Sequence, residues 1–310
     1  EPRAVRGQGP SAHQLKGAAV ASLTRNDLVV SHYTLHGAGP FDPPRFGFEE
    51  RVAAAAAAGF QGIGYLTAAY DIERAAGLND ADMRAILDNY GVTLGEIEFL
   101  WDWSADPDDA ERATNARQLE TLAWAMADAF EPRVVSVGEL AAPEDLPPHD
   151  VVVERFAGLC DRAAEHGLLV ALEFMPWTGI PDAATAGAIA TDAGRANGGI
   201  NADTWHHFRG AKDDAALREH AKRIFMVQLD DADATMEGDL MEDTLLRRRY
   251  PGEGSFDIGG YIRLLDEAGT DVPLSVEILS ADHQALPVEE AARRAHDSTR
   301  AVVDAARSGG

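Results

Sequence analysis

Four acidic or amide side chains lie at or near the downstream ends of short apolar runs. They are Glu173, Asp203, Gln228 and Glu277, and their runs are LLVALEF, GGINAD, IFMVQL and PLSVEIL. Each run is typical of a buried parallel strand, in which a polar residue has no solvent on either face. Four converging oxygen-bearing side chains, two of them Glu, indicate a site for a hard divalent cation.

Strand and helix patterns alternate eight times along the chain. Such a series predicts an α/β protein of the closed (β/α)8 barrel type, whose active face is the carboxyl end of every strand. A dinucleotide-binding fold is disfavoured, because the loop HGAGPFDPP after the first run lacks the G-x-G-x-x-G order and continues into prolines. The predicted strands are residues 28–35, 61–67, 93–100, 133–140, 168–174, 198–203, 224–229 and 273–279.

The 310 residues are predicted to form one barrel domain over 27–310, preceded by a loosely held extension over 1–26. No Ser, Pro or Gly linker long enough to separate domains occurs after residue 40. No stretch of about 18 uncharged apolar residues could span a bilayer. We expect a cytoplasmic protein, although the chain does not begin with Met, so a removed leader stays open.

The formal net charge of −25 restricts the partners. A surface this acidic repels nucleic acid and anionic lipid, and it disfavours highly phosphorylated substrates. We therefore expect a small carbohydrate or related polyol as substrate, with no nucleic acid and no membrane. A homo-oligomer or a small partner subunit is kept as an alternative.

Polar residues near other strand ends are further candidates for the site. His206 follows Asp203 by three residues, close enough for one to bind a metal while the other reaches a substrate. His32, Glu98 and Glu139 lie at or near the ends of the first, third and fourth predicted strands and could touch substrate. Each of these three could equally be scaffolding inside the barrel.

Two tryptophans and one arginine complete the set of candidates. Trp101 and Trp177 follow the third and fifth strands, where aromatic rings commonly form an apolar wall for a sugar face or an aglycone. A packing role for both is equally compatible with the sequence. Arg209 lies near the active face, where a solvated ion pair is favoured over anion recognition.

Five segments in order resemble one known family. LEFMPW, NADTWHHFR, VQLDDAD, RRRYPGEGSFDI and PLSVEIL look like the sugar phosphate isomerase/epimerase family. These are xylose isomerase-like barrels that include ketose 3-epimerases and inosose dehydratases. The resemblance extends over about residues 27–307, and it is specific for the superfamily rather than for a substrate.

The resemblance implies a Mn²⁺, Mg²⁺ or Co²⁺ ion held by Glu, Asp, His and Glu from strands five to eight. By position, the ligands are Glu173, Asp203, Gln228 and Glu277, with His206 near the substrate oxygens. Gln228 departs from the epimerase pattern, which has His there. An all-oxygen site favours Mn²⁺ or Mg²⁺ over Zn²⁺.

The resemblance also implies a metal-dependent isomerase or epimerase that removes a proton next to a carbonyl, through an enediolate whose charge develops against the metal. Glu173 would take the proton from one face and Glu277 would return one from the other. A lyase on the same scaffold is the alternative: an inosose or 3-dehydroshikimate dehydratase, or a β-eliminating deglycosidase subunit for 3-oxo-glycosides or C-glycosides. A DNA-repair endonuclease is disfavoured by the negative charge and the sparse histidines.

Overall fold

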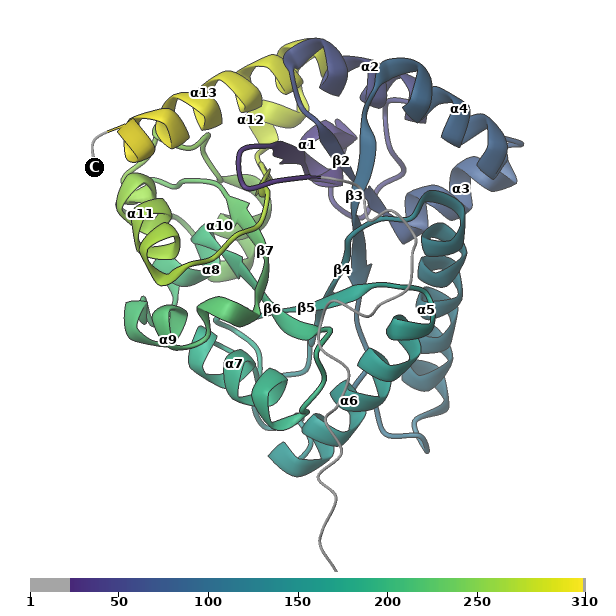
Figure 1. The fold of residues 1–310 in the computed structure, drawn as a ribbon, viewed down its shortest axis with the longest axis vertical. Helices are drawn as coiled ribbons and strands as arrows, with labels where there is room; N and C mark the ends of the chain where they lie inside the picture. The colour runs from purple at the N-terminus through teal and green to yellow at the C-terminus, as the bar shows by residue number, and fades with distance from the viewer. Residues whose placement is uncertain (1–22, 309–310) are drawn as a thin grey trace, which may run out of the picture.

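Eight parallel strands close into a barrel in chain order, β1 to β8, which confirms the predicted fold class (Figure 1). The computed structural model describes residues 23–308, so residues 1–22 of the predicted extension lie outside the described part. The strands are β1 Leu28–Val30, β2 Gly62–Leu66, β3 Thr93–Leu100, β4 Val134–Gly138, β5 Leu169–Glu173, β6 Gly198–Asp203, β7 Ile224–Leu229 and β8 Leu274–Val276.

Helices surround the strands as an outer ring (Figure 1). They are α2 Phe48–Ala58, α4 Asp80–Tyr90, α5 Ala110–Phe130, α6 His149–Glu165, α7 Ala183–Asp192, α9 Asp214–Glu219, α11 Ile258–Ala268 and α13 Val288–Ser308. Sequence signals set their ends: the Asn79 side chain accepts from the first-turn amides of α4, and Gly59 ends α2 at a φ of 103°. No helix within residues 23–308 is long and apolar enough to cross a membrane.

Shorter helices occur after five of the strands, where the sequence predicted loops or continued strand. They therefore lie at the carboxyl ends of the strands, on the side of the barrel that carries the site. They are α1 His32–His36, α3 Thr67–Ala75, α8 Thr204–Arg209, α10 Leu240–Leu246 and α12 Ala281–Gln284, and a 3₁₀ turn, η1 Ala221–Arg223, precedes β7.

The first strand is shorter than predicted. We expected it to run over 28–35, but β1 ends at Val30 and α1 begins at His32. The Ser31 hydroxyl caps this helix by accepting from the Tyr33 amide, and Gly37 ends it with a φ of 71°. The run LVVSHYTL suggested one continuous strand, but Ser31 within it caps a helix and Gly37 after it ends that helix.

The barrel interior is layered. Val134, Ala171 and Met226 form a small apolar cluster nearer the amino ends of their strands. Glu173 and Gln228 come two residues after Ala171 and Met226, so they point to the same interior face one layer higher. On β5 and β7, the interior side chains are therefore apolar below and polar where the strands end.

A buried histidine in α12 links α1 to the loop that precedes α11. His283 in α12 donates from Nε2 to the Thr34 carbonyl at 2.5 Å, which leaves Nδ1 to accept from the Tyr250 hydroxyl at 2.5 Å. Burial lowers the pKa of His283 to about 4, although the bond to Thr34 opposes the shift. The folded protein therefore holds this ring neutral.

This histidine should make stability depend on pH. In the unfolded chain His283 takes up a proton near pH 6.5, whereas in the folded protein it does so only near pH 4. The stability that the neutral ring contributes is therefore complete above pH 6.5 and is lost as the pH falls from 6.5 to about 4. From pH 7.5 to 5.0 the loss due to this group is about 2 kcal/mol. His283→Gln should remove that part of the pH dependence in urea unfolding. An unchanged difference between the two pH values would contradict the assignment.

Candidate active site

Strand pairing brings the four strand-end residues to the carboxyl end of the barrel. Glu173 lies opposite Asn201, two residues before Asp203 on the same face. Asp203 lies opposite Gln228, and Gln228 lies opposite the β8 residue two places before Glu277. All four side chains are buried, with Asp203 fully so and Glu173 and Glu277 retaining 7% and 6% exposure. The sequence prediction that they converge is consistent with this register.

A buried arginine, which the sequence placed near the active face but in a solvated loop, joins this group. Arg248 Nη1 donates to Asp203 Oδ2 at 2.8 Å, to Glu277 Oε2 at 3.1 Å and to a carboxylate oxygen of Asp230. It reaches the site from the loop after α10, and its only sequence signal was membership of the RRR triplet. One guanidinium thus serves three buried carboxyl groups.

The single positive charge of Arg248 cannot balance three carboxylates. The pKa of one carboxyl group is therefore lowered and the pKa values of the other two are raised. Burial raises the pKa of Asp203, but Arg248 and His206 outweigh it, so the net pKa lies below its usual value. Burial and the Asp203 charge hold the pKa of Asp230 well above its usual range, despite Arg248. Burial also raises the pKa of Glu277 to about 8. Asp203 is the charged partner of Arg248, and the other two carboxyl groups tend to retain protons at neutral pH.

Gln228 faces Glu277 through its amide nitrogen. Nε2 of Gln228 donates to Glu277 Oε1 at 3.0 Å, and Ser31 Oγ donates to the same oxygen at 3.0 Å. The Gln228 amide oxygen accepts from Asn201 Nδ2 at 2.5 Å. A ligand role for Gln228 requires its amide to turn, and that role stays a prediction.

Three residues have the spacing of a metal site. Single ligand atoms of Glu173, Asp203 and His206 all lie within 4.8 Å of one another. His206 Nε2 is 3.5 Å from Glu173 Oε1, and its buried Nδ1 has no hydrogen-bond partner among the described residues. Two carboxylates beside an unsatisfied imidazole suit a divalent cation. These residues therefore fit such an ion, with His206 nearer the ligand set than the sequence suggested.

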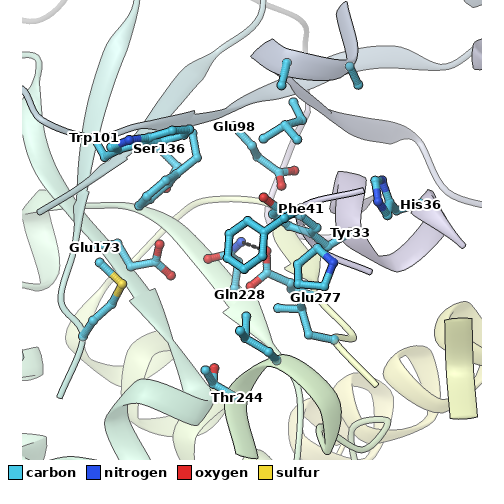
Figure 2. Close-up of a pocket in the computed structure, with 18 of the residues that line it drawn as sticks. Tyr33, His36, Phe41, Glu98, Trp101, Ser136, Glu173, Gln228, Thr244 and Glu277 are labelled. Carbon is cyan, nitrogen blue, oxygen red and sulfur yellow. Dashed lines mark hydrogen bonds between the residues drawn. The ribbon is translucent and has the colours of Figure 1, made fainter. Parts of the chain in front are cut away.

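The site opens into a cavity of about 430 Å³. Glu173, Gln228 and Glu277 form what we call the floor of this cavity. Figure 2 shows Glu173 on one side of Gln228 and Glu277 on the other. Trp101, Trp177 and His206 line the cavity, and the predicted contacts of the two tryptophans with substrate stay a prediction. The volume falls within the range of about 300–1,000 Å³ common for small-molecule sites.

His32 is not among the residues that line the cavity. Its ring is fully buried in α1, with Nδ1 2.8 Å from Arg51 Nη1 and Nε2 3.1 Å from His36 Nδ1. Both ring nitrogens are thus occupied inside the protein, which does not support the predicted contact with substrate. His36 and Tyr33 from the same helix line the cavity instead. The early end of β1 causes this exchange.

Glu139 and Arg209 also lie outside the cavity lining. Glu139 is fully buried and accepts from Arg112 Nη2 at 2.9 Å, so it tethers α5 to the end of β4. Arg209 Nε donates to Asp243 Oδ2 at 2.9 Å, which joins α8 to α10. Both side chains are held by ion pairs in the walls around the site, and neither predicted substrate contact is supported.

Glu98 lines the cavity from β3. Its Oε1 accepts from the His32 amide at 2.8 Å, and its Oε2 lies 3.1 Å from Ser31 Oγ. Burial, Glu96 and Glu277 raise the pKa of Glu98 well above its usual value. Ser31 therefore lies between two carboxyl groups, Glu98 and Glu277.

Residues 52–302 match the sequence-family model of the xylose isomerase-like TIM barrel. The chain belongs to that family. A solved structure described as the IOLI protein with a binding zinc atom has a TM-score of 0.79 at 20% identity, covering 90% of this chain and 98% of that one. At this identity the likeness shows the fold alone.

Curated relatives are enzymes of sugar and polyol chemistry. An inosose isomerase of Bacillus velezensis is 30% identical over 148 residues, 47% of this chain and 52% of that protein. A 3-dehydroshikimate dehydratase of Pseudomonas aeruginosa is 25% identical over 242 residues, 77% of this chain and 37% of that protein. The chain spans about half the length of the inosose isomerases it matches. These relatives support an enzyme that acts on a small molecule.

Proposed function

We propose that the protein is a divalent-metal-dependent isomerase or epimerase of a sugar or related polyol ketone. The observation that carries the proposal is the placement of two carboxyl groups, Glu173 and Glu277, on either side of Gln228 at the floor of one cavity (Figure 2). A substrate between them exposes one face to each. Such an arrangement suits removal of a proton from one face of a carbon and its return to the other.

The two carboxyl groups differ in a way that suits these roles. Burial, together with the neighbouring charges of Glu173 and Asp203, raises the pKa of Glu277 to about 8, so it can donate a proton near neutral pH. Glu173 is bonded neither to Arg248 nor to Gln228 and can face the substrate as the base.

Glu173, Asp203 and His206 would hold the metal ion, with Gln228 and Glu277 as further candidates. A divalent ion supplies positive charge where a carbonyl oxygen gains negative charge. Mn²⁺, Mg²⁺ and Co²⁺ are the ions that the family resemblance implies, and the nitrogen of His206 also suits Zn²⁺.

A lyase is the second candidate. It is favoured by the 3-dehydroshikimate dehydratase relative, which matches more of this chain than the inosose isomerases do. Glu98 and Glu277, whose raised pKa values favour the protonated form, could protonate a departing hydroxyl group. Both candidates share the first proton removal.

Proton exchange in deuterated water tests the shared step. Free ketoses, inosose and 3-dehydroshikimate are incubated with the protein and Mn²⁺, and recovered substrate and product are followed by NMR. We expect deuterium at the carbon next to the carbonyl of at least one compound, and its loss with EDTA. Turnover without deuterium incorporation, or turnover unaffected by EDTA, would contradict the proposal.

A further inference from the structure

Large apolar side chains that are exposed to solvent gather at the mouth of the cavity. Six such side chains occur in the described part of the chain, and four of them line this cavity: Phe41, Ile72, Leu140 and Met241. They come from the loop after α1, from α3, from the loop after β4 and from α10. Phe41 is 86% exposed. Four separate segments thus present apolar groups to one opening, and such a patch commonly marks a binding surface.

Aromatic rings continue the apolar surface from the mouth into the cavity. We call this whole surface the wall; it consists of Phe41, Ile72, Leu140, Met241, Phe99, Trp101 and Trp177. Phe99 and Trp101 both line the cavity, with ring centroids 6.3 Å apart and planes inclined by 27°. Trp177 also lines it, and its ring stands edge-on to His206 at 5.3 Å. The wall therefore reaches from the opening to the side chains that we assign to catalysis.

Floor and wall have opposite polarity within one cavity. A bare polyol ring on the floor would satisfy Glu173, Gln228 and Glu277 but would leave the wall in water. Covering such a wall with an apolar group is favourable in proportion to the area buried. The net charge of −25 disfavours an anionic ligand at this opening.

We propose that the substrate is a neutral polyol ketone that carries an apolar substituent about the size of an aromatic ring. The carbonyl end lies on the polar floor, and the substituent packs against Phe41, Ile72, Phe99 and Trp101. This inference rests on the proposed function for the placement of the ketone. The wall itself is independent of the reaction type.

A matched pair of probes tests the wall separately from the chemistry. Phenyl β-D-glucopyranoside and methyl β-D-glucopyranoside differ only in the apolar group, and their affinities are measured by calorimetry with Mn²⁺ present. We expect the phenyl compound to bind at least about tenfold more tightly. Phe41→Ser combined with Ile72→Ser should remove most of that preference, and both positions are exposed enough to change without disturbing the core. Met236→Ser is the matched control, since Met236 is exposed but does not line the cavity.

Two results would overturn the inference. One is equal binding of the two glucosides to the unaltered protein. The other is a dimer in light scattering that dissociates in the Phe41→Ser variant, because the apolar mouth would then be covered by a second chain. Deuterium exchange into an unsubstituted ketose would still uphold the proposed function in either case. Phenyl preference without any exchange would uphold the wall and reject the reaction.

Discussion

Glu173→Gln and Glu277→Gln should each lower turnover by about 10²-fold or more, because each change removes a proton-transferring carboxyl group and keeps its shape. The amide retains an oxygen that can bind a metal ion, so Mn²⁺ affinity by calorimetry should change far less than turnover. Glu267→Gln, a surface change whose partner is Arg218, is the matched control and should keep the normal rate. Near-normal rates in both site variants would mean that these carboxyl groups bind only the metal.

The pattern of the two losses separates an epimerase from a lyase. An epimerase that runs in both directions needs a group on each face and should lose turnover with either change. A lyase could lose C–H exchange with one change and only leaving-group departure with the other. Deuterium incorporation into recovered substrate is measured for each variant. Exchange that persists without product in one variant would favour the lyase.

Arg248→Met should destabilise the protein by about 3–5 kcal/mol, because it leaves a buried charge without its partner. Asp203 is fully buried and depends on Arg248 to stay charged, while Asp230 and Glu277 tend to be protonated. The free energy of unfolding is measured in urea with EDTA present, so that no added cation replaces the guanidinium.

The neighbouring arginine provides the control for this prediction. Arg249 is 46% exposed and pairs with Asp233 at 2.8 Å. Arg249→Met should cost no more than about 1 kcal/mol, as is usual for an exposed ion pair. If both methionine variants lose the same stability, then Arg248 does not balance a charge in the site.

The strands were the most predictable elements, because burial on both faces leaves continuous apolar runs. The runs TLGEIEFL, GGINAD and IFMVQL have the same bounds as β3, β6 and β7. The short helices α1, α3 and α10 were missed. They span five to nine residues, and their placement depends on packing over the ends of the strands, not on local periodicity alone.

The site was predictable where strand register determines position and less so where loops contribute. Glu173, Asp203, Gln228 and Glu277 could be identified because parallel strands end at one level. Arg248 could not, since it reaches Asp203 across 45 residues of chain and from a loop with three consecutive arginines. Because β1 ends early, His36 and Tyr33 line the cavity and His32 does not, which does not support its predicted contact with substrate.

The central claim is a divalent metal ion at the ends of β5 and β6 that supports proton transfer. Anomalous scattering from crystals soaked in MnCl₂ tests it most directly. The account predicts one manganese peak at about 2.0–2.4 Å from carboxylate oxygens of both Glu173 and Asp203. The remaining ligands in the map would decide between His206 and the pair Gln228 and Glu277. Well-soaked crystals without a manganese peak within reach of Glu173 and Asp203 would contradict the account.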